Sequence, residues 1–479
     1  MDRGRLSRRE LIGAGAALAG GIAVAPALAG CSDGDSGGAA SRGRVVVVGG
    51  GLAGLTAGYE LGRKGFDVQL VEARDRLGGR VHTVRSFTSD QHGEAGAEAI
   101  DTKHREILRL CRRFGLPLEN AYSGYGNRRG TVYRRGRNFL PREFATPAVK
   151  AEMERFWRAV DRLAEPLDGT DPTANGGARQ DRHSVADLLD RLRIGGRARW
   201  LLEARIESDY GSPVARLSLL YLTLSERLYW NQPAGGIERW RIKGGNSTLV
   251  DELTRRLVTP PMLQAPVTAI RWDGAAVEVD TDDGETLTGD KLVVAAPTAA
   301  LRQIEFSPAL PRREAGFIAA IDLCAVAKTL IQYERRIWRR QGRTGGSTTD
   351  LPIGQTWETT DQQDGAPGIL IAYTAGRRGE VTATIDDRQR TIQAREDIDV
   401  VFPGTRRLAG DSFSVAWRAE PYSGGCWAVF RPGQVSKHWL GLHEPTGPIH
   451  WAGEHTERLN GYMNSAVASG MRVAGEIAG

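Results

Sequence analysis

Cysteine is scarce in this sequence, with only Cys31, Cys111, Cys324 and Cys426 among 479 residues. Cys111 and Cys324 stand in apolar segments and are expected to be core residues, so no disulfide framework is predicted. The eight histidines show no spacing typical of metal ligands, and no metal site is predicted. The chain also lacks a basic tract interleaved with aromatic residues, which argues against nucleic acid as a partner.

The length and charge of the chain limit its class. A chain of 479 residues can form two domains with complete cores. Its formal net charge of +6 is spread along the sequence, and we interpret it as a solvated surface. Weak attraction to an anionic membrane is the alternative. The 60 glycines suit a fold with many tight turns between strands and helices.

The N-terminal segment, residues 1–30, has the features of an export signal. Its run S-R-R-E-L-I at 7–12 resembles a twin-arginine signal peptide, and an Ala/Gly-rich apolar stretch follows. The run L-A-G-C that ends at Cys31 resembles a bacterial lipobox, in which cleavage would leave a lipidated cysteine. Cleavage after Ala29 and an uncleaved spanning helix are the alternatives. Residues 31–43 would be a flexible tether, so we predict an exported, extracytoplasmic protein that meets the membrane only through a lipid at Cys31.

A glycine pattern near the start of the predicted mature chain is typical of a dinucleotide-binding unit. Val45–Val48 is a β-branched run, as in a strand that is buried on both faces. Gly49, Gly51 and Gly54 follow at the G-x-G-x-x-G spacing. The first permits a tight turn, the second a close approach of a pyrophosphate, and the third the packing of a helix over 52–63. The pyrophosphate is expected at the N-terminus of that helix.

The segment after this helix indicates which dinucleotide is bound. A second strand is predicted over 68–71, and Glu72 at its end is expected to accept the ribose 2′-hydroxyl. The run R-D-R-L-G-G-R that follows resembles the second glycine pair of the FAD-dependent amine oxidase superfamily. The resemblance implies FAD as the cofactor, with Gly79 near its flavin side and with Arg74 and Arg80 as phosphate partners.

The C-terminal region carries two further motifs of the same superfamily. The run W-R-A-E-P-Y-S-G-G-C-W at 417–427 resembles a segment of flavin monoamine oxidases, and 450–468 resembles their closing flavin motif. With these motifs the chain is identified as a member of the flavin monoamine oxidase family, whose relatives include L-amino-acid and polyamine oxidases. The implied cofactor-binding positions are Val267 for the adenine, Gly453 and Glu454 for the pyrophosphate and ribityl chain, and Met463 for the isoalloxazine edge. Trp417 is also implied as a cofactor-binding residue.

The same resemblance places three side chains beside the reacting part of the flavin. Trp427 and Tyr462 match the two aromatic rings that flank the substrate in this family, where π-faces orient an amine and stabilise developing positive charge. The usual first member is tyrosine, so Trp427 predicts a narrower or more apolar slot. Cys426 matches the cysteine through which some monoamine oxidases bind FAD covalently at its 8α-methyl group. The alternative is a small residue that packs against the flavin.

Two departures from the family concern the substrate side. The family has a lysine that is joined through a water to flavin N5, and at its expected position this chain has Gln303 or Glu305. We interpret Lys328, which is nearby in the sequence, as structural. The arginine that binds the substrate carboxylate in L-amino-acid oxidases is replaced by Ala99, beside Glu98. Glu98 is the predicted polar anchor or base, since its carboxylate would attract an ammonium group; a glutamate bound by backbone is the alternative.

The predicted fold class is α/β. A Rossmann-type FAD-binding domain is expected from three segments, 44–105, 232–298 and 420–479, with a mixed α/β substrate-binding domain from 106–231 and 299–419. Spacing predicts helices over 103–114, 147–164, 184–192, 197–207, 215–228 and 247–257. Strands are expected over 265–272, 276–281, 290–296, 327–333 and 368–374, the last two half-buried. Loops are expected over 342–350 and 359–367.

The predicted activity is FAD-dependent oxidation of a C–N bond, in an amine or an amide, to an imine, with dioxygen reduced to hydrogen peroxide. One alternative is an L-amino-acid oxidase whose carboxylate clamp has moved to an arginine of 127–142. Another is an oxidase of specialised metabolism whose imine is captured intramolecularly. A desaturase of C–C bonds and a flavin-bearing protein without turnover are further alternatives. The substrate, the electron acceptor and the oligomeric state, including a homodimer, are left open.

Overall fold

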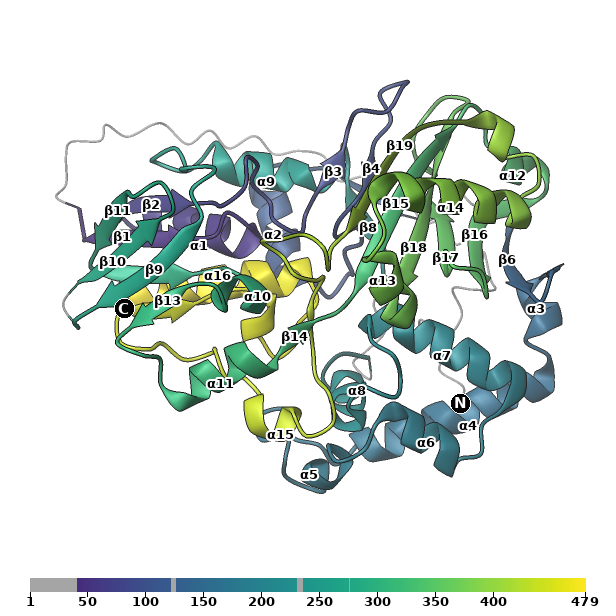
Figure 1. The fold of residues 1–479 in the computed structure, drawn as a ribbon, viewed down its shortest axis with the longest axis horizontal. Coiled ribbons are helices and arrows are strands. Elements are labelled where there is room, and N and C mark those ends of the chain that lie inside the picture. The colour runs from purple at the N-terminus through teal and green to yellow at the C-terminus, as the bar shows by residue number, and fades with distance from the viewer. Residues whose placement is uncertain (1–40, 122–125, 231–235, 275) are drawn as a thin grey trace.

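The computed structural model describes residues 41–121, 126–230, 236–274 and 276–479. The expected signal peptide, Cys31 and most of the tether lie outside these residues. The first and last described segments lie together on one side of the molecule, the largest sheet lies on the other, and a group of helices lies below that sheet (Figure 1). Within the described ranges, no helix is both long and apolar enough to cross a membrane.

A four-stranded parallel sheet is the core of the first side. Its strands are, in spatial order, β2 (Asp67–Val71), β1 (Arg44–Val48), β12 (Lys291–Val294) and β21 (Ile449–Trp451). The four valines of β1 are at most 5 % exposed, as expected for a strand covered on both faces. Three segments that are far apart in the sequence supply this sheet, which confirms the predicted α/β fold.

Two helices pack on each other beside the parallel sheet, α1 (Leu52–Gly62) and α16 (Met463–Ala478). Glycines permit the close approach. A Cβ added at Gly54 would lie 2.0 Å from the carbonyl oxygen of Gly49, and one at Gly470 would lie 2.4 Å from that of Ala53. Gly54 therefore packs α1 on the turn after β1, and Gly470 packs α16 on α1.

A second sheet in this part of the molecule consists of β11 (Thr286–Gly289), β10 (Val277–Thr281), β9 (Val267–Trp272) and β13 (Glu305–Ser307). Strand β13 runs parallel to β9. The sequence predicts that residues from 299 onward belong to the other domain, yet β13 continues the sheet beyond that point. The connection is short because only helix α10 (Thr298–Leu301) lies between β12 and β13.

The largest sheet has seven strands on the other side of the molecule (Figure 1). In spatial order they are β19 (Ala409–Ala416), β15 (Val326–Tyr333), β18 (Gly368–Ala375), β17 (Gln355–Glu358), β16 (Arg343–Thr349), β6 (Arg129–Arg134) and β7 (Arg137–Phe139). The prediction that 327–333 and 368–374 are strands is confirmed, but the prediction that they are half-buried is wrong. Every residue of β15 is buried, because this strand pairs with β18 and β19 and is covered on both faces.

Strand β16 corrects the prediction of a loop over 342–350. Its sequence, R-T-G-G-S-T-T, contains no apolar side chain, so hydrophobic periodicity gave no strand signal. It lies between β17 and β6, where Ser347 Oγ and Thr356 Oγ1 are 2.7 Å apart and hydrogen-bond across the pair. This hydroxyl pair contributes to the pairing, which needs no apolar side chain from β16.

The predicted helices are present with shifted ends. The helices between residues 105 and 225, including the unpredicted α3 and α5, are α2 (Arg105–Arg113), α3 (Pro141–Phe144), α4 (Pro147–Ala164), α5 (Gly177–Gln180), α6 (Val185–Arg191), α7 (Gly196–Tyr210) and α8 (Leu219–Ser225). Later helices are α9 (Ser247–Thr254), α11 (Arg312–Ala320), α12 (Ile337–Arg340), α13 (Gly376–Thr382), α14 (Asp387–Val401) and α15 (Val435–His438). Short two-stranded pairs join β3 (Thr83–Val84) to β4 (Gly93–Glu94), β5 (Leu118–Asn120) to β8 (Trp240–Ile242), and β14 (Asp322–Leu323) to β20 (Ala428–Val429).

Candidate active site

A cavity of about 740 Å³ is lined by residues from both sides of the molecule. Part of its wall comes from the β1–α1 turn and from the start of α16, and part from α7, β15 and β17. Gly54, which packs inside the fold, is the one predicted site residue that does not line it. The predicted residues that do are Gly49, Gly51, Glu72, Arg74, Gly79, Arg80, Glu98, Val267, Trp417, Cys426, Trp427, Gly453, Glu454, Tyr462 and Met463.

The β1–α1 turn forms a cradle for an anionic group. Gly49 has a φ of +105°, and a Cβ added at Gly51 would meet nothing within 4 Å, so open cavity lies against this backbone. The first N–H groups of α1 have no partners within the helix and favour a phosphate there. Glu72, at the end of β2, accepts hydrogen bonds from the backbone N–H groups of Gly50 (2.8 Å) and Arg74 (2.9 Å). These residues fit a dinucleotide.

Arg74 and Arg80 join distant segments of the cavity wall. Arg80 Nη1 donates to Glu454 Oε1 at 2.8 Å and to the carbonyl oxygen of Cys426 at 2.6 Å. Arg74 Nη2 donates to Ser423 Oγ at 2.9 Å. The two guanidinium groups therefore tie the R-D-R-L-G-G-R run at 74–80 to the C-terminal motifs. Their expected contact with phosphate stays a prediction.

Trp427 and Tyr462 both line the cavity, and Gly461, which precedes Tyr462, packs against the Trp427 ring. A Cβ added at Gly461 would lie 3.3 Å from the Trp427 ring, and one added at Gly211 would lie 3.2 Å from another part of that ring. Both glycines have positive φ, +84° and +64°, and together they make room for a tryptophan. The Tyr462 ring packs against that of Tyr229, with ring centroids 5.1 Å apart. Two aromatic residues thus line the cavity in which a substrate would bind.

The thiol of Cys426 is partly buried and lines the cavity. Its backbone N–H donates to the carbonyl oxygen of Cys324 at 2.9 Å, which fixes the strand end that carries it. Cys111 and Cys324 are buried, as predicted for core residues, and the three described cysteines are free thiols. Of the described cysteines, Cys426 therefore lines the cavity, whereas Cys111 and Cys324 do not.

Lys328, which the sequence predicts to be structural, lines the cavity. Its side chain, on β15, is 7 % exposed and reaches the cavity, where Nζ donates to two backbone carbonyl groups and to Glu98 Oε2. Gln303 also lines the cavity, whereas Glu305 is exposed on β13 and does not. Because β15 is buried along its whole length, its sequence does not show which face meets a cavity. The charge of the lysine within an apolar strand was the available signal.

The surroundings of Glu98 correct its expected role as an anchor or a base. Its carboxylate accepts from Lys328 Nζ and from Arg241 Nη2, both at 2.9 Å. Burial alone would raise the pKa of Glu98, but the two cations and hydrogen bonds from Lys328 and the Trp357 indole lower it below its ordinary value. A carboxylate that two cations already neutralise has little charge left for a substrate. It also binds a proton weakly.

Two carboxyl groups near Glu98 have a raised pKa, whereas that of Glu98 is lowered. Burial raises the pKa of Glu94 to about 7, although a hydrogen bond from the Asn246 backbone opposes the rise. Burial likewise raises the pKa of Asp361 to about 6, against the attraction of Arg241. The neighbourhood of Glu98 thus contains carboxyl groups that titrate near neutral pH, whereas Glu98 itself stays ionised.

Further polar residues of the cavity were not found from the sequence. Asp101 N donates to His104 Nδ1 at 3.0 Å, so in the neutral ring Nε2 carries the proton and donates to the Tyr229 hydroxyl, also at 3.0 Å. The Tyr229 hydroxyl in turn donates to the Asp101 carboxylate. Tyr210 also lines the cavity, and its buried hydroxyl has no hydrogen-bond partner among the described residues. An unpaired buried hydroxyl is unfavourable, so Tyr210 is suited to bind a molecule in the cavity.

Comparison with known proteins shows what this cavity belongs to. Residues 52–478 match the protein family described as flavin containing amine oxidoreductase. The chain belongs to this family. Flavin-containing amine oxidase A of Equus caballus is 27 % identical over 455 residues, which cover 90 % of this chain and 84 % of that protein. The flavin-containing amine oxidase of Oncorhynchus mykiss is 27 % identical over 452 residues, covering 90 % and 85 %.

Solved structures of amine oxidases have the same fold. Cyclohexylamine oxidase from Brevibacterium oxydans IH-35A has a TM-score of 0.81 at 22 % identity, covering 91 % of this chain and 98 % of that chain. Putrescine oxidase bound to putrescine has a TM-score of 0.80 at 21 % identity, with the same coverage. This chain is thus a flavin enzyme that oxidises amines to imines, and the predicted family, fold and oxidation of amines are confirmed. The form of the flavin and the reduction of dioxygen to hydrogen peroxide stay predictions.

Proposed function

We propose that this amine oxidoreductase uses FAD to oxidise amines that carry no carboxylate beside the nitrogen, and that dioxygen is reduced to hydrogen peroxide. The proposal rests on the cationic side chains at the cavity, which are paired with carboxylates of the protein. Lys328 is paired with Glu98, and Arg205 is paired with Asp209 at 3.6 Å. A substrate carboxylate would have to compete with a protein carboxylate for either cation. No arginine of 127–142, all of which are described, lines the cavity.

The wall of the cavity supports FAD as the form of the flavin. The β1–α1 turn supplies a phosphate cradle, Glu72 supplies an acceptor for a ribose hydroxyl, and Val267 lies at the same cavity for an adenine. The start of α16 at Met463 supplies helical N–H groups at the other part of the wall. The residues that would hold FAD are Gly49, Gly51, Glu72, Arg74, Gly79, Arg80, Val267, Trp417, Gly453, Glu454 and Met463.

The chain's own residues bind and orient the amine. When bound, the flavin accepts the hydride equivalent that leaves the carbon beside the nitrogen. Trp427 and Tyr462 hold the amine between π-faces and stabilise positive charge on the nitrogen as it develops. The Tyr210 hydroxyl supplies a hydrogen bond within the same cavity. We assign to Lys328, rather than to Gln303 or Glu305, the place of the buried lysine that the family has near the flavin, because Lys328 is buried and lines the cavity.

Cys426 is proposed to form a thioether with the 8α-methyl group of the flavin. The thiol S–H bond and one methyl C–H bond would break, with the two electrons passing to the flavin ring and then to dioxygen. Its thiol lines the cavity and its backbone is fixed by Cys324, as a covalent attachment needs. The alternative, contact without a bond, would leave the flavin extractable.

Paired substrates that differ only in the carboxylate test the proposed specificity. Oxidised enzyme is mixed without oxygen with phenethylamine or with L-phenylalanine, and loss of flavin absorbance is followed. We expect the amine to bleach the flavin at least about a hundredfold faster, because only the amino acid brings an anion into a cavity whose cations are paired. On admission of air, a peroxidase-coupled assay should detect hydrogen peroxide. Faster bleaching by the amino acid would favour the L-amino-acid oxidase instead.

Export and lipid attachment are proposed on the sequence of residues 1–31. The twin-arginine run and the lipobox-like L-A-G-C support them. Detergent phase partition of the protein from cells, with a Cys31→Ser variant as control, tests the anchor: only the native chain should enter the detergent phase. Light scattering of the solubilised protein then distinguishes a monomer from the homodimer.

A further inference from the structure

Glu98 lies at the centre of a buried cluster of charged side chains. Its side chain is 10 % exposed and those of Lys328 and Arg241 are 7 % and 5 % exposed, while Lys328 Nζ and Arg241 Nη2 each lie 2.9 Å from the carboxylate. The Trp357 indole N–H (3.0 Å) and the Thr359 hydroxyl (3.1 Å) donate to the same group. Glu98 and Lys328 line the cavity, whereas Arg241 lies behind Glu98, away from the cavity wall.

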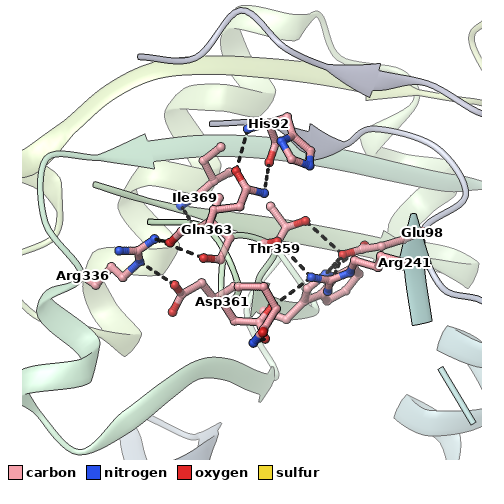
Figure 2. Close-up of polar contacts among 12 residues, drawn as sticks. His92, Glu98, Arg241, Arg336, Thr359, Asp361, Gln363 and Ile369 are labelled. Carbon is pink, nitrogen blue, oxygen red and sulfur yellow. Dashed lines mark hydrogen bonds and ion pairs between the residues drawn. The ribbon is translucent and has the colours of Figure 1, made fainter. Parts of the chain in front are cut away.

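A second carboxylate holds Arg241 from the other side. Arg241 Nη1 donates to Asp361 Oδ1 and to the carbonyl oxygen of Thr359, both at 2.9 Å (Figure 2). Both residues belong to the loop 359–367, in which Gln363 exchanges two hydrogen bonds of 2.9 Å with the backbone of His92. The guanidinium group therefore stands between two carboxylates and cannot turn toward the cavity without losing both.

Lys328 is held as firmly as Arg241. An ammonium group has three N–H donors. Nζ uses them on the carbonyl oxygens of Glu94 (3.1 Å) and Gly96 (2.9 Å) and on Glu98 Oε2 (2.9 Å). Glu98 is the one charged acceptor of the three. It therefore both fixes the direction of the ammonium group and supplies the negative charge nearest to it.

The charges of these four side chains balance. Lys328 and Arg241 are cations, and Glu98 and Asp361 are carboxylates, joined in the order Lys328–Glu98–Arg241–Asp361. Glu98 and Lys328 line the cavity. Without the charge of Glu98 beside it, Lys328 would attract an anion and repel a cationic amine. Paired charges at this separation in a protein interior cancel most of each other's field.

We propose that Glu98 is a positioning residue that cancels the charge of Lys328 at the cavity wall and thereby sets the enzyme's preference for amines over carboxylate-bearing molecules. The inference rests on the proposed function and deepens it by naming the residue that excludes anions. It replaces the role of general base that the sequence suggested for Glu98. Arg241 and Asp361 hold Glu98 in the orientation that this requires.

Binding of a carboxylate probe tests the proposal without turnover. Dissociation constants of benzoate and of its neutral analogue benzamide are measured from changes in the flavin absorbance of the oxidised holoenzyme. Glu98→Gln leaves one excess positive charge, so we expect benzoate to bind about tenfold more tightly and benzamide to be unchanged. Lys328→Met leaves one excess negative charge and should weaken benzoate by a similar factor.

The double variant Glu98→Gln/Lys328→Met restores the balance and should bind benzoate as the native enzyme does. If it keeps the full gain of Glu98→Gln, Glu98 does not act through Lys328 and the proposal is overturned. If Glu98→Gln does not fold or does not hold flavin, Lys328→Met still tests the proposal. Benzoate binding by Lys328→Met that is as tight as in the native enzyme, or tighter, contradicts it. Absence of amine oxidation would refute the proposed function yet leave this binding test intact.

Glu358 offers a matched control. Its side chain is fully buried, like that of Glu98 it is paired with two cations, Arg336 at 2.8 Å and Arg339, and it accepts from a tryptophan, Trp338 Nε1, at 2.7 Å. It does not line the cavity. Glu358→Gln should reduce stability as Glu98→Gln does, and should leave benzoate binding at the native value. An equal gain of benzoate affinity in both variants would show a general loosening rather than a charge effect.

Discussion

Arg80 Nη1 lies 2.8 Å from Glu454 Oε1, and this ion pair joins residues 374 positions apart in the sequence. Glu454 is 7 % exposed and Arg80 22 %, so little water screens the pair. Glu454 Oε2 also accepts from the backbone N–H of Gly461, next to Tyr462. The Glu454 carboxylate thus connects Arg80 to the turn that carries Tyr462, an aromatic residue of the active site.

Substitution Glu454→Gln should weaken both the fold and flavin retention. It leaves Arg80 partly buried without its counter-ion, and we expect a loss of about 2–4 kcal/mol in the free energy of unfolding. Urea denaturation followed by tryptophan fluorescence measures the stability, and ultrafiltration measures the released flavin. As a control, Glu154→Gln breaks a pair whose side chains are 60 % and 65 % exposed and should change stability by less than about 0.5 kcal/mol. Equal losses in both variants would contradict the prediction.

The flavin of the native enzyme should stay with the polypeptide after acid precipitation. Cys426→Ala should release it into the supernatant, since no thiol would remain at that position of the cavity wall. Intact mass of the washed pellet measures the attached flavin. Cys324→Ala, which removes a neighbouring buried thiol, is the control and should retain it. Flavin released from the native protein would mean that Cys426 only contacts the cofactor.

Tyr210→Phe should make the protein more stable and its substrate binding weaker. The hydroxyl has no partner among the described residues, so its removal relieves a buried unpaired group by about 1 kcal/mol. The lost hydrogen bond to a bound amine should raise KM about fivefold with little change in kcat. Steady-state kinetics and thermal unfolding measure the two effects. A variant with lower stability and unchanged KM would place the hydroxyl in the fold rather than in substrate binding.

The free energy of unfolding should fall as the pH rises toward neutral, because buried Glu94 then loses its proton. Burial raises the pKa of Glu94 from its ordinary value of 4.5 to about 7. The folded protein therefore favours the protonated carboxyl, so this stabilisation is complete below pH 4.5 and is lost as the pH rises through about 7. The difference corresponds to about 3 kcal/mol. Urea denaturation at pH about 5 and about 8 should show this loss in the native protein and not in Glu94→Gln; parallel losses would contradict it.

The sequence predicted those parts of the site that depend on the spacing of residues close together in the chain. The glycines from Gly49 to Gly79 and the motif around Trp427 could be located because each motif is contiguous and its backbone demands are specific. Lys328 could not be assigned, because β15 is covered on both faces and its pattern does not distinguish them. The partners of Glu98 come from β8, β15 and β17, which no spacing rule brings together. Strand β16 was missed because its sequence has no apolar side chain and therefore no alternating hydrophobic pattern.

The parallel sheet has a consequence for the order in which this enzyme is made. Its outer strand β21 and the packed helix α16 come from the last residues, 449–478, whereas β1 and α1 come from the first described ones. A chain in which residues 449–478 have not yet folded therefore has half a nucleotide site, without the helix end at Met463 or the Glu454 that pairs with Arg80. We therefore expect flavin to bind only after these residues have packed on β1 and α1. If the predicted twin-arginine signal is used, that binding would precede export, because this route carries folded proteins.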